Sequence, residues 1–158
     1  MMTTRPPTPL HPRPRLFLAG SIEMGGAPDW QQAIETALAD VDVDIWNPRR
    51  LAWDDSWPQE ASFGPFHEQV TWELEGLERA DVVVVFFAPG TMSPISLLEL
   101  GLLAAQKPAR TLVCCAPGFW RKGNVDVVCA RYGLQQVDDL AALITEVRRR
   151  LALLSPKA

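Results

Sequence analysis

Short apolar runs and segments with helical spacing alternate along most of the chain. Four valines and two phenylalanines follow one another in the central run, and a run without polar positions favours a strand that is covered on both faces. The apolar runs predict strands at residues 15–20, 41–46, 82–88, 110–116 and 134–137. Apolar residues at every third or fourth position predict helices at residues 27–40, 67–79, 95–106, 125–132 and 139–154.

This alternation predicts the fold class. Strands that alternate with helices are typical of a three-layer α/β fold, Rossmann- or flavodoxin-like, and here of a five-stranded, mostly parallel sheet with helices on both faces. Residues 1–14 contain five prolines and little apolar content, so we expect a disordered or loosely docked tail. Residues 15–158 then form a single domain.

Composition and net charge argue against several classes of binding partner. The net charge of −4 provides no general basic field of the kind that nucleic acid attracts. No apolar run approaches the roughly 20 residues that a membrane helix needs, and the N-terminus lacks the apolar core of a signal peptide. The three cysteines fit neither a disulfide framework nor a common zinc spacing. We therefore expect a cytoplasmic protein without a metal or a cofactor, and without nucleic-acid or membrane partners.

Glu99 is the first residue to consider for chemistry. It lies in a leucine-rich helical segment that follows the central strand after a short polar turn. Ligands bind beyond the carboxyl ends of the strands in doubly wound sheets, and a carboxylate among leucines must lose water or find a partner. The alternative is a carboxylate near a helix start that faces solvent or caps backbone N–H groups.

The segments that follow the strands are the expected ligand loops. The loop after the first strand does not match the G-x-G-x-x-G pattern, so it indicates no nicotinamide cofactor. Residues 51–66 suggest either a metal site at Asp54, Asp55 and Ser56 or, as we prefer, a solvated lid. From position at strand ends, we expect ligand contacts from Gly20, Ser21, Ile22, Asn47, Arg49, Trp53, Pro89, Gly90, Trp120 and Asn124. The alternative for the first loop is a flexible turn. The alternative for Trp53 and Trp120 is that they cover the core or a subunit surface.

Three stretches together resemble the nucleoside 2-deoxyribosyltransferase family and its relatives that hydrolyse 2-deoxynucleoside 5′-phosphates. They are LFLAGSI, ERADVVVVFF and SPISLLELG, of which the E-L-G is the most specific, and GNVDVVCARYG resembles a deoxyribosyltransferase-like branch. The resemblance implies that Glu99 is the nucleophile. It also implies that Glu73, eight residues before Asp81, is the acidic partner, although the family usually has Asp there.

The resemblance also indicates which residues could bind a 5′-phosphate of the substrate. Ser93 stands six residues before Glu99, where the transferases have Asp and the nucleotide hydrolases have a Ser that holds a 5′-phosphate. Ser96 and Arg49 are further phosphate candidates from their position. Asp81 opens the central strand, where a cap or turn residue is the default, and we include it with Glu99 and Glu73 as a catalytic candidate.

The sequence thus predicts cleavage of the N-glycosidic bond of a (deoxy)nucleoside or nucleotide by a Glu nucleophile, with transfer to another base or to water. The alternative is a non-catalytic nucleotide-binding or sensing module on the same fold. A flavodoxin-like electron carrier is not favoured, because SIEMGG offers only one hydroxyl for a phosphate loop. The expected partners are a small nucleoside or nucleotide and, as the resemblance implies, further copies of the chain in a dimer or larger homo-oligomer.

Overall fold

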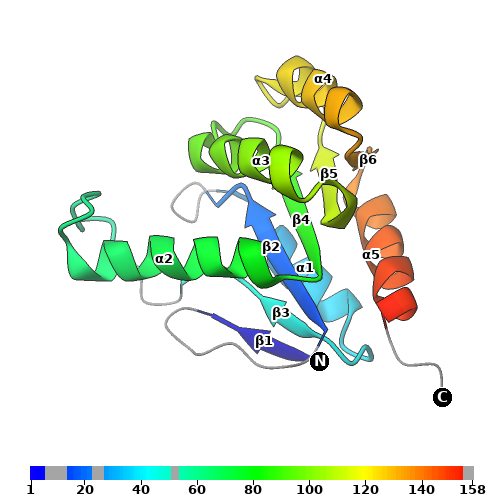
Figure 1. Ribbon diagram of the computed structural model, residues 1–158, viewed down its shortest axis with the longest axis horizontal. Helices are drawn as coiled ribbons and strands as arrows, with labels where there is room; N and C mark the ends of the chain where they lie inside the picture. Colours follow the sequence, from blue (N-terminus) through cyan, green and yellow to red (C-terminus); the bar gives the residue numbers. More distant parts are fainter. Residues whose placement is uncertain (6–13, 23–26, 51–53, 155–158) are drawn as a thin grey trace.

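The structure, a computed structural model, describes residues 1–5, 14–22, 27–50 and 54–154. A six-stranded parallel sheet lies between two layers of helices, with the strands in the order β1-β3-β2-β4-β5-β6 (Figure 1). The strands are β1 (Met2–Thr4), β2 (Arg15–Gly20), β3 (Asp44–Trp46), β4 (Val82–Phe87), β5 (Thr111–Cys115) and β6 (Gln135–Val137). The helices are α1 (Trp30–Ala37), α2 (Gly64–Arg79), α3 (Pro94–Gln106), the 3-10 turn η2 (Pro108–Arg110), α4 (Lys122–Tyr132) and α5 (Leu140–Leu154). The predicted three-layer α/β class is confirmed, with one strand more than expected.

The additional strand, β1, comes from the segment for which the sequence predicted a disordered or loosely docked tail. Met2–Thr4 pairs in parallel with β3, and the Met2 amide donates to the Val43 carbonyl at 2.9 Å. The Thr4 hydroxyl donates to Asp44 Oδ1 at 2.8 Å. We expected a disordered or loosely docked tail because the segment has little apolar content. Backbone pairing and one buried side-chain hydrogen bond hold this edge strand without such content. Residues 6–13 lie outside the described part of the chain.

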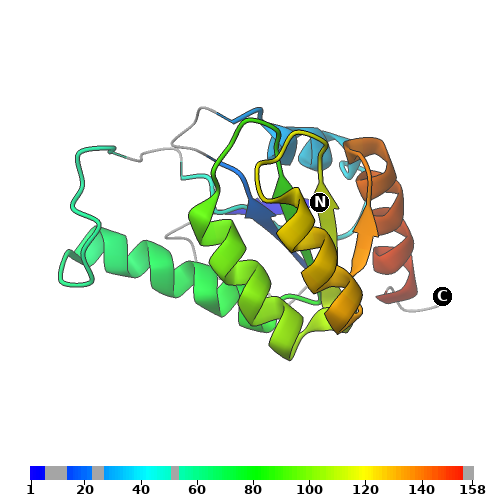
Figure 2. The same cartoon turned by 90° about the horizontal axis from the view of Figure 1, so that it is seen from above.

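The central strand explains the valine run. Alternate β4 side chains, Val83, Val85 and Phe87, pack beneath α2, α3 and α4, whereas Val82, Val84 and Phe86 face α1 and α5 on the other side of the sheet (Figure 2). Because both faces are buried, no position of this strand needs a polar residue. No helix in the described ranges is long and apolar enough to cross a membrane.

All paired strands run in the same direction, so their carboxyl ends share one edge of the sheet. Gly20, the last residue of β2, lies opposite Phe86 with a φ of +140°. A Cβ at Gly20 would come within 2.3 Å of the Phe86 carbonyl oxygen. Only glycine permits this approach, and it brings the loop after β2 against the end of β4.

Helix α2 also approaches the sheet closely. It begins at Gly64, three residues before the predicted start, with a proline in its first turn where a missing N–H costs little. Gly76 lies on the aromatic ring of Phe17, and a Cβ there would meet a ring carbon at 2.3 Å. The close contact brings the face of α2 that carries Glu73 toward the neighbouring helix α3.

Candidate active site

Glu99 lies in the second turn of α3, which starts shortly after the carboxyl end of β4. Leu100, Leu103 and Ala104 attach the helix to the sheet. This attachment rotates Glu99 away from solvent, and the residue is only 8% exposed. Within the described part of the chain, its carboxylate has no hydrogen-bond or ion-pair partner. The predicted burial of this carboxylate therefore agrees with the structure.

Glu73 reaches the same place from α2. It is partly buried, and its Oε1 accepts a hydrogen bond of 2.6 Å from Nε2 of Gln69, one helical turn earlier. The Gln69 amide also donates to the Pro48 carbonyl at 3.0 Å, so it connects α2 to the segment after β3. Sequence analysis did not single out Gln69. Its position four residues before Glu73, on the same face of the helix, was the available indication.

The two carboxyl groups influence each other. Burial, and then the charge of Glu73, raise the pKa of Glu99 to about 8. Burial raises the pKa of Glu73 to about 7, against the lowering effect of the hydrogen bond from Gln69. Two like charges in a desolvated site cannot both ionise easily, so the pair holds about one proton near neutral pH. The hydrogen bond from Gln69 stabilises the charged form of Glu73 and thereby favours the proton on Glu99.

A third buried carboxylate, Glu35 on α1, shows the contrasting arrangement. Arg5 Nη2 lies 2.9 and 3.1 Å from its two oxygens, and Asn47 Nδ2 donates to Oε1 at 2.7 Å. Glu35 is thus a buried charge with a cation and an amide beside it, as structural carboxylates usually are. Sequence analysis did not identify Glu35, although its place next to Ile34 on the apolar face of α1 pointed to burial.

Three hydroxyl groups join the loops after β2 and β4. The Ser21 oxygen lies 2.9 Å from that of Thr91 and 2.7 Å from that of Ser93, and the Thr91 and Ser93 oxygens are 3.0 Å apart. Ser21 Oγ also accepts the Ala88 amide at 2.9 Å, while its carbonyl accepts the Trp30 indole N–H at 2.9 Å. Ser93, the residue directly before α3, has a left-handed backbone with a φ of 45°. The hydroxyls of Ser21 and Ser93 therefore fix the shape of this edge in the absence of a ligand, and Thr91 is a member that the sequence did not indicate.

The residues after β3 form a second polar group. Asn47 is buried, and its Oδ1 accepts the Arg49 amide at 2.9 Å. The Arg49 side chain contacts Gln31 Oε1 at 3.3 Å and lies 3.8 Å from an Asp29 oxygen. Nε of Arg49 and Nη1 of Arg50 are nevertheless buried without a hydrogen-bond partner in the described ranges. Nε of Arg49 is the atom that lies 3.8 Å from Asp29 Oδ1, so an anion that binds there would compete with this carboxylate.

The other residues that we expected to contact a ligand differ in how far they are buried. Ser96 is buried on α3, three residues before Glu99 and on the same face. Ile22 is partly buried directly after Ser21, and Pro89 and Gly90 form an exposed turn after β4. Trp120 is half exposed, and its indole N–H donates to the Met92 carbonyl at 3.0 Å. Trp53 lies outside the described residues.

The remaining expectations concern two loops. Asn124 faces a groove of about 200 Å³ between α3 and α4, with Leu97 and Leu100 on the opposite wall. In the proposed lid, the Asp54 carboxylate accepts hydrogen bonds from the backbone and the hydroxyl of Ser56. This local turn is the ordinary role of Asp in a loop, and it leaves the lid or metal alternatives for this segment without direct support.

Asp81 does not join the carboxyl pair. It precedes the first residue of β4, at the edge of the sheet opposite to the ligand loops, and Arg15 binds it through the backbone amide at 2.8 Å and through the guanidinium at 3.0 Å. These bonds to Arg15 lower the pKa of Asp81 despite partial burial. A cavity of about 390 Å³ lined by Asp81, Arg110 and Arg150 lies at this far edge too. We correct the expectation accordingly, because the strand itself separates Asp81 from Glu99.

Comparisons with known proteins found a matching family model and a solved structure with a similar fold. The family model described as nucleoside 2-deoxyribosyltransferase like matches residues 13–119, a range that includes Glu73, Ser93 and Glu99. A solved structure, described as a conserved protein from Enterococcus faecalis V583, superposes with a TM-score of 0.61 at 13% identity. The superposition covers 86% of this chain and 98% of the other. No curated protein sequence matches the chain.

Proposed function

This chain belongs to the nucleoside 2-deoxyribosyltransferase-like family, and from that premise we propose that it cleaves the N-glycosidic bond of a 2-deoxynucleoside 5′-phosphate or of the corresponding nucleoside. Glu99 is the nucleophile and Glu73 the proton donor and acceptor. The finished reaction transfers the sugar either to water or to a second base.

One observation carries this proposal: the two carboxyl groups share a desolvated site in which no described residue places a cation beside them. Burial holds the pKa of both groups near or above neutrality, so that one ionised and one protonated carboxyl group coexist. Glycosidic cleavage by a covalent route requires this combination, with a carboxylate at the sugar and a carboxylic acid at the leaving group. Glu35 does not offer this combination, because Arg5 pairs with its carboxylate.

The first step forms one bond and breaks another. A carboxylate oxygen of Glu99 attacks the anomeric carbon, the bond from that carbon to the base nitrogen breaks, and its electron pair leaves with the base. The proton of Glu73 moves to the departing base. The reaction uses the form of the pair in which Glu73 holds the proton and Glu99 is ionised. Positive charge that develops on the sugar ring favours this form, because it stabilises the Glu99 carboxylate.

The second step reverses the roles. Water or an acceptor base attacks the anomeric carbon, the ester to Glu99 breaks, and Glu73 takes the proton that the attacking group loses. The enzyme returns to its initial state with one proton in the pair. Neither step changes the oxidation state of any atom.

Two features at the strand ends support a phosphorylated substrate. Arg49 presents a buried Nε without a hydrogen-bond partner among the described residues, and its side chain is 18% exposed. Ser93, at the position that resembles the phosphate serine of nucleotide hydrolases, directly precedes α3, whose N-terminus favours an anion. The hydroxyl of Ser93 must then leave Ser21 or Thr91 to bind a phosphate oxygen.

The test is to incubate the full chain with 2-deoxynucleosides and their 5′-monophosphates, with and without a second free base, and to separate the bases by chromatography. Release of base that Glu99→Ala reduces by at least about 1,000-fold supports the nucleophile. Asp81→Asn is the matched control at another acidic residue, and it should keep the rate. A rate that does not depend on the second base identifies hydrolysis, and exchange of bases identifies transfer.

The same experiment decides the alternative, a binding or sensing module. In that case no base is released by the wild-type protein, and Glu99→Gln keeps its affinity for nucleotide in calorimetry. Full activity of Glu99→Ala would show that the carboxyl pair is not the reaction centre.

A further inference from the structure

The side-chain oxygen of Gln69 is a buried hydrogen-bond acceptor that has no donor. Gln69 is only 5% exposed, and within the described part of the chain its Oε1 is one of five buried side-chain atoms without a hydrogen-bond partner. The other four are nitrogen atoms of Arg5, Gln31, Arg49 and Arg50. A buried polar atom costs free energy unless a group bonds to it, so the missing donor needs an explanation.

The other contacts of the Gln69 amide fix its orientation. Nε2 lies 3.0 Å from the Pro48 carbonyl oxygen and 2.6 Å from Glu73 Oε1. The Pro48 carbonyl can only accept a hydrogen bond, and so can the Glu73 carboxylate when it is ionised, so these contacts use both hydrogens of the amide nitrogen. A rotation of the amide by half a turn would place its oxygen against both acceptors. The free position is therefore an acceptor, and only a donor can satisfy it.

This oxygen lies beside the carboxyl pair. Covalent geometry holds the oxygen and nitrogen of an amide about 2.2 Å apart, so Gln69 Oε1 is no more than about 5 Å from Glu73 Oε1. A pentose ring with its substituents spans a comparable distance. An opening of the site that lets a substrate reach Glu73 therefore also brings the substrate within reach of Gln69 Oε1.

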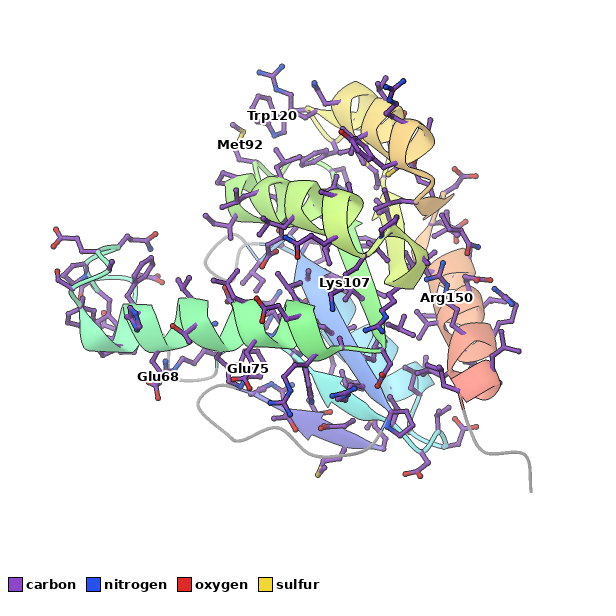
Figure 3. All side chains as sticks on the ribbon, in the orientation of Figure 1. Glu68, Glu75, Met92, Lys107, Trp120 and Arg150 are labelled. Atoms are coloured by element: carbon purple, nitrogen blue, oxygen red, sulfur yellow. The ribbon has the colours of Figure 1, made fainter. Side chains whose placement is uncertain are left out.

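The ion pairs of α2 lie on a different face of the helix. Glu68 and Glu75 point away from α3 (Figure 3). Glu68 pairs with Arg50 at 3.6 Å, and Glu75 pairs with Arg79 one turn later. Among the described residues, Glu73 has no such cation. The partner for the oxygen beside Glu73 is therefore to be sought in the ligand.

The proposed substrate has few donors close to its glycosidic bond. The base atoms next to the glycosidic nitrogen are C–H groups or acceptors, such as adenine N3 and thymine O2, and the amino group of guanine is the exception nearby. The sugar of a 2-deoxynucleoside 5′-phosphate has one hydroxyl group, the 3′-hydroxyl, because the 2′ carbon has none and the 5′ oxygen carries the phosphate. This hydroxyl group is the donor that all such substrates share.

We propose that Gln69 Oε1 accepts a hydrogen bond from the 3′-hydroxyl group of the substrate sugar. The inference rests on the proposed function, and it makes Gln69 a residue that determines specificity in addition to its contact with Glu73. A hydrogen or a phosphate ester at the 3′ position would leave the buried oxygen unpaired, so the site selects sugars with a free 3′-hydroxyl. Free nucleotides meet this condition, whereas nucleotides within a DNA strand do not.

The experiment measures base release from a 2-deoxynucleoside 5′-monophosphate and from its 2,3-dideoxy analogue, with the base on which wild type is most active. The ratio of the two kcat/KM values should be roughly 10- to 100-fold greater for wild type than for Gln69→Met. The variant should be slower with both substrates, because Glu73 loses its donor. The intrinsic effect of the 3′ oxygen on the glycosidic bond is the same for both proteins, so it cancels in this comparison. Gln32→Met is the matched control, since Gln32 is exposed on α1, and it should keep the wild-type ratio.

Equal ratios for wild type and Gln69→Met would overturn the proposal, because a residue that only holds Glu73 slows both substrates alike. If circular dichroism shows that Gln69→Met does not fold, Gln69→Asn keeps the amide but withdraws it by one methylene, and its ratio should fall in the same direction. Failure of the proposed function has a different signature. Wild type would then release no base from either substrate, and both proposals would be wrong.

Discussion

The hydroxyl oxygen of Ser21 lies 2.7 Å from that of Ser93, 72 positions later in the chain. This contact joins the loop after β2 to the residue that caps the start of α3, the helix that carries Glu99. Because Ser21 also accepts the Ala88 amide, one side chain fixes both the end of β4 and the start of α3. The position of the candidate nucleophile therefore depends on a residue that the ligand does not need to touch.

Replacement of Ser21 by Ala should lower the free energy of unfolding by about 1–3 kcal/mol, because the buried Ala88 amide loses its acceptor. Urea denaturation measures this change. Thr36→Ala is the control, since its hydroxyl donates to a carbonyl on the exposed side of α1. If Ser21→Ala is no less stable than Thr36→Ala, the hydroxyl group does not hold the two loops together.

Replacement of Glu99 by Gln should stabilise the protein increasingly as pH rises. The pKa of Glu99 is raised by folding, so the folded state keeps a proton that the unfolded state loses, and stability falls between the unfolded pKa of 4.5 and about 8. Gln has no such proton. We expect equal stability at pH 4 and a gain of about 2–4 kcal/mol at pH 8, measured by denaturation across this range.

Glu35→Gln is the contrasting variant, because it removes a charge that Arg5 and Asn47 stabilise. It should lose stability at neutral pH where Glu99→Gln gains it. Equal effects of the two substitutions would mean that the environment of Glu99 is not short of positive charge.

The rate of base release should depend on one proton in the carboxyl pair. The value of kcat/KM should be greatest between about pH 7 and 8, and it should fall on the acid side as Glu99 stays protonated and on the alkaline side as Glu73 loses its proton. In Glu73→Gln the alkaline fall should disappear and the maximal rate should drop roughly 100- to 10,000-fold. Because the charge of Glu73 no longer raises the pKa of Glu99, the acid limb should also move to lower pH. An unchanged profile would exclude Glu73 as the acid.

Arg49 should discriminate between nucleotides and nucleosides. If its unsatisfied Nε binds a 5′-phosphate, Arg49→Met should reduce kcat/KM for the monophosphate by roughly 10- to 100-fold and leave the nucleoside nearly unaffected. Arg148→Met on α5 is the control, since Arg148 pairs with exposed Asp40. A similar loss for both substrates would give Arg49 a structural role through Asp29 and Gln31 instead.

Much of the fold was evident in the sequence. The valine run of β4 and the apolar spacing of α5 each express a local pattern, because burial on two faces or on one helical face repeats with the period of the element. The place of Glu99 among leucines likewise predicted its burial. Element ends were less certain, and α2 starts three residues before the predicted position.

Local sequence patterns were sufficient to predict a parallel α/β sheet that is covered on both faces, and a carboxylate among leucines after its central strand. Both features depend on neighbours within a few residues. The partner of each acidic side chain depends on the tertiary structure. Glu73 approaches Glu99 because α2 rests on Phe17 through Gly76, Asp81 pairs with Arg15 at the far edge, and Glu35 receives Arg5 from the chain's first residues. Such pairings join residues tens of positions apart, and a charge's environment follows from the packing of whole elements and not from the residues beside it in the chain.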